Sequence, residues 1–235
     1  NNNYSAGFNG KNAYLTLLQT TGDMELHAPV TIEFWMNPKT YPATGKLAML
    51  YQKANPSNGN GIYISMDEEG IIGATINNSY FTTPAPAVIG FWTHISVCYN
   101  NGKIWIYYNG SEVLYQNLVA GDVYQPYQTY IGAMKDGSGN MINFYKGEID
   151  ELRVWSTVRA WYDILNYCHQ SFTGIGTPYS NLRISLPLNN NFTDQGGKEL
   201  NTVQNKNITF IDHRNENNSY ISYNSSLWNN NNTLF

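Results

Sequence analysis

The chain has 235 residues, only 13% of which are charged, and its formal net charge is −4 at pH 7. This length is enough for one large all-β domain, or for one domain plus a piece of another, with a core that needs no metal or disulfide framework. Phosphate binding requires clustered Lys and Arg, and the sequence has no basic stripe, so we expect no nucleic-acid partner.

Short alternating segments typical of β-strands run from Tyr14 to about Val154. Ile, Val, Tyr, Phe and Trp alternate with polar residues, and Gly, Asn or Pro interrupts the pattern every 8 to 12 residues. This spacing indicates a β-sandwich and argues against βαβ units. The predicted strands are 13–18, 30–37, 48–53, 61–67, 71–76, 92–100, 103–109, 129–134 and 147–155.

Two Asn-Gly segments predict tight hairpin turns. "NNGK" (100–103) joins two alternating runs, and "YYNGSEV" (107–113) contains a second Asn-Gly pair at the end of the next run. Asn and Gly tolerate the positive φ that such turns require, so we expect a meander of antiparallel strands.

A short amphipathic helix is predicted after the last of these strands, within "STVRAWYDILNYC" (156–168). Its apolar residues at helical spacing are Val158, Trp161, Ile164 and Leu165. The two cysteines, Cys98 and Cys168, lie in unrelated contexts without a CxxC pattern. Two buried free thiols are the preferred interpretation, and one disulfide is the alternative.

Five segments in order carry a resemblance to a known family. They are "GFNGKNAYLTL", "VTIEFWMNP", "GIYISMDEEG", "GFWTHISVCYNNGKIWIYYNG" and "TYIGAMKDGSGNMINFYKGEIDELRVWSTVR". The succession resembles the laminin-G-like jelly-roll superfamily, the concanavalin-A-like sandwiches that include the pentraxins. The resemblance implies an all-β, two-sheet antiparallel jelly-roll sandwich with a short helix after the last strand, and ligand sites on its loops.

The C-terminal part of the sequence differs in composition from the rest. "LRISLPL" (182–188) is strand-like, and from residue 189 onward Asn dominates. We assign residues 1–174 to one laminin-G-like module and residues 175–235 to an Asn-rich C-terminal extension. Because the tail also resembles the opening of a following module in tandem arrays, it either packs back as extra strands or begins such a module.

"KGEIDELRVW" (146–155) raises the question of catalysis. Some glycoside hydrolases with this sandwich place three carboxylates at alternate positions of one strand. Glu148 and Asp150 fill the first two positions, but strict alternation puts Leu152 at the third and sends Glu151 to the opposite face. We therefore expect no enzyme.

The family resemblance implies a structural calcium ion near the start of the chain. Asp150 would supply a carboxylate, and "FNGKN" (8–12), with Asn9 and Gly10, would supply the oxygen ligands that Ca²⁺ prefers. In the alternative interpretation, Asp150 accepts hydrogen bonds from backbone amides of that turn. Calcium is the only cofactor that we expect.

Two loops match the region where pentraxin-like members bind calcium and ligand. Asn58, Asn60 and Asp136 fall on the pattern, and Asn140 would add an amide oxygen. Met134 and Lys135 depart from the pattern, and two ordinary Gly/Asn-rich loops are the alternative. Loop aromatics that present a ring to a sugar are further candidates. The preferred pair is Tyr124 and Tyr127, followed by Tyr80 and Phe81.

The functional prediction is a non-catalytic, extracellular or cell-surface binding and adhesion module. It recognises a carbohydrate, as a glycan or a cell-surface glycoprotein, through loops at the sandwich rim, with calcium as an assisting ion. A module that binds a protein receptor, or a structural spacer, is the alternative, and a hydrolase is the third hypothesis. No apolar run approaches 18 residues, so we expect no membrane insertion, and the opening "NNNYSAG" indicates a portion of a larger multi-domain protein.

Overall fold

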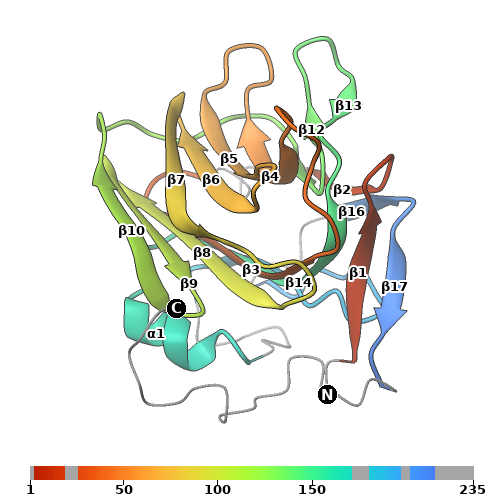
Figure 1. Cartoon of the computed structure of the whole chain (residues 1–235). Helices are drawn as coiled ribbons and strands as arrows, with labels where there is room; N and C mark the ends of the chain where they lie inside the picture. The colour runs from red at the N-terminus through yellow and green to blue at the C-terminus, as the bar shows by residue number, and fades with distance from the viewer. Residues whose placement is uncertain (1–2, 19–25, 171–179, 197–201, 215–235) are drawn as a thin grey trace.

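Two antiparallel β-sheets lie face to face in the structure (Figure 1). The computed structural model describes residues 3–18, 26–170, 180–196 and 202–214. A short helix, α1 (Trp161–Tyr167), follows the long strand β14 (Lys146–Trp155), as the sequence predicts. The predicted all-β jelly-roll sandwich is confirmed.

The two sheets differ in which parts of the chain they contain. Sheet A runs in the order β10 (Ser111–Asn117), β9 (Lys103–Tyr108), β8 (Thr93–Asn100), β3 (Val30–Pro38), β14, β1 (Tyr4–Asn9) and β17 (Thr209–Asp212), and β15 (Leu182–Leu186) also pairs with β14. Sheet B runs in the order β16 (Thr202–Lys206), β2 (Tyr14–Leu18), β11 (Thr129–Ile131), β4 (Ala48–Ala54), β5 (Gly61–Met66), β6 (Ile71–Ile76) and β7 (Ser79–Pro86). A separate hairpin joins β12 (Met134–Lys135) to β13 (Met141–Ile142). The expected meander holds within β4–β7 and within β8–β10, whereas β3 and β14 lie side by side at the centre of sheet A.

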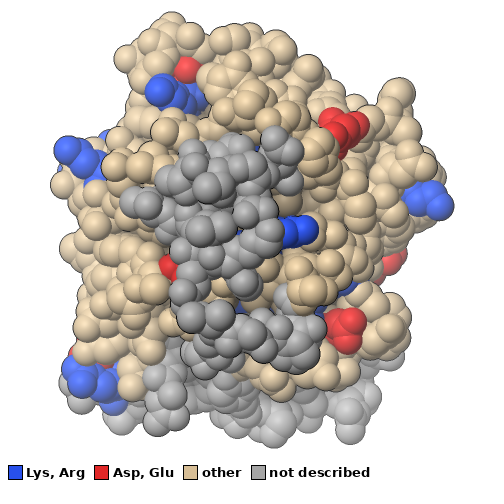
Figure 2. Space-filling view, turned by 180° about the vertical axis from the view of Figure 1, so that it is seen from behind, with Lys and Arg blue, Asp and Glu red and all other residues tan. Residues whose placement is uncertain are grey.

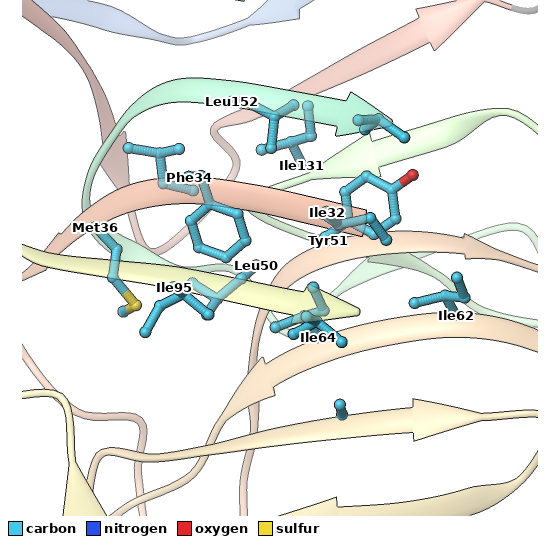
Figure 3. Close-up of a cluster of buried hydrophobic side chains, with 14 of the residues drawn as sticks. Ile32, Phe34, Met36, Leu50, Tyr51, Ile62, Ile64, Ile95, Ile131 and Leu152 are labelled. Atoms are coloured by element: carbon cyan, nitrogen blue, oxygen red, sulfur yellow. The ribbon is translucent and has the colours of Figure 1, made fainter. Parts of the chain in front are cut away.

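The core lies between the sheets, where every second side chain of each strand points inward. Ile32, Phe34 and Met36 of β3 enter it, together with Ile62 and Ile64 of β5 (Figure 3). The alternation of polar and apolar residues in β3 thus places one face in the core, as predicted. The opposite face of β3 is also buried, beneath other parts of the chain.

Both predicted Asn-Gly hairpins are confirmed. Asn101 and Gly102 have φ of 43° and 79° between β8 and β9, and Asn109 and Gly110 have φ of 49° and 82° between β9 and β10. Two consecutive residues with positive φ define the turn whose twist matches that of the flanking strands.

Strands β1 and β7 are absent from the strands that the sequence predicts. The segment of β7 contains Pro84 and Pro86, which argue against a strand. β7 lies at the edge of sheet B, where the missing N–H groups cost no ladder hydrogen bond on the open side. Tyr80 and Phe81, expected on a loop, therefore stand on a strand.

A β-bulge in β14 changes the predicted faces of its side chains. The register with β3 shifts between Asp150 and Arg153, so Glu151 and Leu152 together stand opposite a single residue, and Glu151 takes a left-handed φ of 49°. Leu152 enters the core (Figure 3), whereas Glu151 binds Arg153 on the outer face. The strict alternation used above is thus wrong beyond Asp150: Glu151, rather than Leu152, shares the outer face with Glu148.

The described part of the C-terminal extension adds strands to both sheets. β15 pairs with β14, β16 pairs with β2, and β17 pairs with β1. The predicted boundary between residues 174 and 175 falls within 171–179, outside the described residues, as does the end of the chain from residue 215. Cys98 and Cys168 are free and buried, and burial raises the pKa of each thiol to about 11.

Candidate functional site

The outer face of sheet A is covered by residues 156–170. Nε1 of Trp35 donates a hydrogen bond to the carbonyl oxygen of Cys168 at 2.7 Å, and Nη1 of Arg153 donates one to the carbonyl oxygen of Tyr167 at 3.2 Å. These contacts close the centre of this sheet against a ligand.

Four side chains form an ionic cluster beneath this cover. Oε1 of Glu33 lies 2.7 Å from Nη1 of Arg159 and 3.5 Å from Nη1 of Arg153, and it accepts a hydrogen bond from Nε1 of Trp155 at 2.9 Å. The Arg159 guanidinium also lies 4.4 Å from the centre of the Trp155 ring. Burial alone would raise the pKa of the Glu33 carboxyl, but the two guanidinium groups outweigh it and lower that pKa. Oε1 of Glu33 thus serves three partners, whereas its Oε2 is buried without a hydrogen-bond partner among the described residues.

Glu148 is the centre of a second buried polar cluster, which includes a residue of the C-terminal extension. Oε2 of Glu148 accepts a hydrogen bond from Oγ of Ser5 at 2.5 Å and lies 2.9 Å from Nε2 of His213. Oε1 of Glu148 lies 2.6 Å from Nζ of Lys39. A catalytic triad uses the two imidazole nitrogens separately, one for the hydroxyl and one for the carboxylate. Here both groups contact Nε2, so the arrangement stabilises the docking of β17 rather than activating Ser5.

The carboxylates of "KGEIDELRVW" are inaccessible to a substrate. Glu148, Asp150 and Glu151 are 3%, 0% and 4% exposed. Glycosidic bond cleavage requires two carboxyl groups that flank the sugar. This strand has the residue types of a hydrolase motif, but its described surroundings bury all three.

The structure does not bring Asp150 together with Asn9 and Gly10. In the pairing of β1 with β14, Asn9 stands opposite Lys146. Asp150 is four residues further along β14, roughly 14 Å away at the rise of an extended strand. The expected calcium arrangement is therefore corrected: the register of β1 places a lysine, rather than the aspartate, beside the turn.

The side-chain oxygen of Asn9 is hydrogen-bonded to the backbone of the same turn. Oδ1 of Asn9 accepts hydrogen bonds from the N–H groups of Lys11, Asn12 and Ala13 at 2.9, 3.0 and 3.1 Å. This oxygen therefore has no vacant direction for a cation. Across the described ranges, no three His, Cys, Asp or Glu side chains gather in a group suited to a metal ion.

The predicted loop residues gather at one end of the sandwich, which we call the rim (residues 55–60, 77–78, 121–128 and 136–140). The loop after β4 and the β12–β13 hairpin are both at the top of Figure 1. A Cβ added to Gly137 in the hairpin would lie 3.2 Å from the carbonyl oxygen of Pro56, so these two loops touch. The structure thus brings Asn58 and Asn60 close to the turn of Asp136 and Asn140.

The polar groups of the rim bind one another. Oδ1 of Asp136 accepts hydrogen bonds from the N–H groups of Ser138 and Asn140 at 2.9 and 2.8 Å, and these bonds, that of Asn140 first, lower the pKa of its carboxyl. Oδ1 of Asn58 accepts one from the N–H of Asn60 at 3.0 Å. The other rim carboxylate, Asp122, accepts hydrogen bonds from the N–H groups of Ala28 and Val123 at 3.0 and 2.8 Å. Both carboxylates are thus engaged by backbone groups, so the rim as arranged does not fit the charge and ligand number that calcium requires.

The Asn77–Asn78 turn connects the rim and was missed by the sequence analysis. Nδ2 of Asn78 donates to Oδ1 of Asn60 at 2.9 Å, and Nδ2 of Asn77 donates to the carbonyl oxygen of Asp122 at 2.9 Å. The two asparagines have φ of 45° and 69°. Two consecutive Asn after an alternating run are a hairpin signal that would have found this turn.

Tyr124 and Tyr127 lie on the rim segment that Asp122 begins. Tyr124 stacks on His27 with ring centres 4.7 Å apart, so one of its faces is occupied. The carbonyl oxygen of Tyr127 accepts a hydrogen bond from Nζ of Lys53 at 2.5 Å. Burial lowers the pKa of that ammonium group to about 8.

The outer face of sheet B carries a row of uncharged residues in cross-strand register, which we call the outer row. Its members, each paired with the next, are Thr16, Tyr130, Gln52, Tyr63, Thr75 and Tyr80. The core side chains of β5 and β6 alternate with these positions, so the row faces away from the core. The sequence alone does not reveal this row, because its members become neighbours only through the pairing register of the strands.

Only part of the outer row is open to solvent. Gln52 is buried beneath the β12–β13 hairpin, and its side chain exchanges two hydrogen bonds with the backbone of Lys135 at 3.0 and 2.8 Å. Tyr80 is 50% exposed, and Tyr63 and Thr75 are half-buried. We call Tyr63, Thr75 and Tyr80 the open platform; it crosses strands β5, β6 and β7, which run side by side in Figure 1.

On the face shown in Figure 2, the Lys and Arg side chains and the Asp and Glu side chains are scattered among uncharged residues. The described residues contain no helix with the length and apolar character needed to cross a bilayer.

Comparison with solved structures returns proteins with the same sandwich. A putative carbohydrate-binding protein from Bacteroides ovatus superposes with a TM-score of 0.70 at 15% identity, over 90% of this chain and 60% of that chain. Domain 4 of AbnA, an extracellular GH43 arabinanase from Geobacillus stearothermophilus, solved in complex with arabinotriose, gives 0.51 at 18% identity, over 69% and 75%. A SAP-like pentraxin from Limulus polyphemus gives 0.54 at 19% identity, over 70% and 81%. At these identities the likeness shows the fold, and this chain spans about 60% of the length of the first of these structures.

The sequence comparisons bear on the family alone. A search of curated proteins finds no match. The family model of the concanavalin A-like lectin/glucanases superfamily matches residues 9–165, about two thirds of the chain. The chain therefore belongs to the concanavalin A-like lectin/glucanase superfamily.

Proposed function

We propose that this chain is a non-catalytic carbohydrate-binding module that holds a glycan on the open platform, with the rim at its border. The observation that carries the proposal is the register of Tyr63, Thr75 and Tyr80 on the exposed part of sheet B. Sugars present C–H faces that pack on aromatic rings, and hydroxyl groups that pair with uncharged donors and acceptors. This platform offers both.

The absence of catalysis in the proposal rests on the burial of the candidate carboxylates. Glu148 is held by Ser5, His213 and Lys39, and Glu151 by Arg153. To act on a sugar, these side chains would have to lose both their cover and their partners. The structure thus supports binding over turnover.

The comparisons support the same ligand class. The Geobacillus domain was solved with arabinotriose, and a CBM40 domain of a Ruminococcus gnavus sialidase, similar at 12% identity, was solved with a sialyllactose. We extend carbohydrate binding to this chain by analogy of fold. By the same analogy, we place it in a secreted or cell-surface protein with further domains.

A glycan microarray tests the proposal. The full chain is applied once with calcium and once with a chelator, and signals above background for at least one glycan family are expected. Because the described residues hold no group of three His, Cys, Asp or Glu side chains suited to a metal ion, we expect the same signals in both conditions. A flat array in both conditions would overturn glycan binding, and signals only with calcium would show that an ion assists.

A protein partner is the second candidate function, and one exposed turn favours it. Val88, Ile89 and Phe91, between β7 and β8, are 49%, 42% and 67% exposed. The turn is fixed, because the N–H of Phe91 donates to the carbonyl oxygen of Val88 at 3.1 Å. Three large apolar side chains on one fixed turn are typical of an interaction site. A flat array combined with partner capture that Phe91→Ser abolishes would favour this alternative.

A further inference from the structure

Resting on the proposed function, we infer that the open platform takes a neutral, linear oligosaccharide that runs across the strands. Tyr80 and Tyr63 provide two successive stacking rings, and Gly73 sets the pose of the Tyr80 ring.

The Tyr80 ring covers a glycine of the neighbouring strand. A Cβ added to Gly73 would lie 2.7 Å from Cζ of Tyr80, so the ring occupies the space that a side chain would fill. Tyr80 pairs directly with Thr75, which makes Gly73 its diagonal neighbour on β6. Most side chains stand upright on a sheet, but here the missing Cβ lets the ring reach over the backbone.

The pose of this ring leaves a surface for a sugar. The Tyr80 hydroxyl also lies against Gly73, while Tyr80 as a whole remains 50% exposed. One side of the ring therefore packs on Gly73 and the other side faces solvent. An aromatic ring that already packs on the sheet loses little conformational entropy when a sugar packs on it.

Tyr63 supplies the second ring. It stands on β5 and pairs with Thr75, which in turn pairs with Tyr80 on β7. The Tyr63 hydroxyl donates a hydrogen bond to the carbonyl oxygen of Asn55 at 3.3 Å, which orients the ring toward the rim. The backbones of the two tyrosines are two strands apart, roughly 10 Å, a span that an oligosaccharide of several sugar rings can cover.

The charges beside the platform select against acidic sugars. The outer row has no Lys, Arg, Asp or Glu. Burial, and then the negative charge of Asp67 just after β5, raise the pKa of the Tyr80 hydroxyl. The same charge would repel a carboxylate or sulfate bound there. Lys135 borders the row at Gln52, but its Cε lies 3.9 Å from the Cβ position of Gly139, so its side chain follows its own hairpin.

Calorimetric titration with defined oligosaccharides tests the ligand class. The probes are cellohexaose, xylohexaose and mannohexaose as neutral chains, and hexagalacturonate and a heparin hexasaccharide as anionic chains. We expect at least one neutral chain to bind, more tightly than its disaccharide, with an affinity that changes less than twofold when NaCl rises from 50 to 500 mM. Binding of the anionic chains alone would overturn this inference but would still support glycan binding. If none of the five probes binds and the array shows no signal, both the inference and the proposed glycan binding are overturned.

Variants test the two rings with the neutral chain that binds. Tyr80→Ala and Tyr63→Ala are each expected to weaken binding at least tenfold, and Tyr80→Phe less than threefold, because the ring is kept. Gly73→Val should also weaken binding, since it displaces the Tyr80 ring. Tyr115→Ala, which removes a tyrosine of similar exposure (42%) from sheet A, is the matched control and should bind like the wild type. Wild-type affinity of Tyr80→Ala with an unchanged circular dichroism spectrum would overturn the inference.

Discussion

Glu33 and Arg159 form an ion pair of 2.7 Å under the cover of sheet A, in side chains that are 0% and 5% exposed. The pair ties the segment after β14 to the centre of the sheet. The pair helps to cover the outer face of sheet A, whereas the outer face of sheet B carries the open platform.

Glu33→Gln should destabilise the fold strongly. The change leaves the charges of Arg153 and Arg159 buried without their shared carboxylate, and removing one member of a buried pair costs about 3–5 kcal/mol. Urea unfolding followed by tryptophan fluorescence measures the loss. Arg214→Ala, which breaks the exposed pair with Asp212, is the control and should leave the unfolding midpoint nearly unchanged. Equal effects of the two variants would contradict the assignment.

Stability should depend on the ionisation of Glu148 in acid. Burial would raise the pKa of this carboxyl, but hydrogen bonds from His213, Lys39 and Ser5 lower it to about 2. A lowered pKa means that the stabilisation is complete above the unfolded value of about 4.5 and is lost as the pH falls toward 2. The contribution is on the order of 3 kcal/mol. The unfolding free energies of the wild type and Glu148→Gln should converge between pH 4.5 and 2, and a constant difference would argue against this role.

Gly110 should be more sensitive to substitution than a glycine of similar φ in open space. A Cβ at Gly110 would lie 2.6 Å from Cα of Leu165 in α1, whereas a Cβ at Gly45 would meet nothing within 4 Å. Both residues have positive φ, 82° and 70°, so each Ala variant carries about 1–2 kcal/mol of backbone strain. Only Gly110→Ala adds a clash with the helix. Thermal melts that rank Gly45→Ala as equally harmful would refute this contact.

Deleting Glu151 should leave the chain folded but less stable. The bulge holds one residue more than regular alternation needs, so without Glu151 the order Asp150, Leu152, Arg153 and Val154 still keeps Leu152 and Val154 in the core and Arg153 on the outer face. The deletion removes the ion pair between Glu151 and Arg153, so urea unfolding is expected to show a lower midpoint while circular dichroism keeps the β spectrum. Glu151→Gly keeps the bulge and should also fold, and loss of the β spectrum in the deletion variant would mean that the fold requires the bulge itself.

The sequence predicts the elements whose signal is local. Alternation locates β3 and β8, and the Asn-Gly pairs give the turns at Asn101 and Asn109, because period-two burial and positive φ are set by neighbouring residues. The bulge at Glu151 escaped prediction because the left-handed φ of a glutamate is imposed by tertiary contacts.

The candidate site was only partly predictable. The loops around Asn58 and Asp136 were expected near one another by resemblance, and the structure brings them together. The expected link between Asp150 and the turn at Asn9 failed because a shift of four residues in the register of β1 cannot be derived from alternation. The open platform was missed for the same reason, since Tyr63 and Tyr80 become neighbours only through β6.

The central claim is that a glycan lies on β5, β6 and β7. Backbone amide chemical shifts of the isotopically labelled chain, titrated with the neutral hexasaccharide that binds most tightly, test it most directly. We predict that the largest changes occur at Tyr63, Thr75 and Tyr80 and at their neighbours on these strands. Changes confined to β8–β10, or to the turn of Val88 and Phe91, with β5–β7 unperturbed, would contradict it.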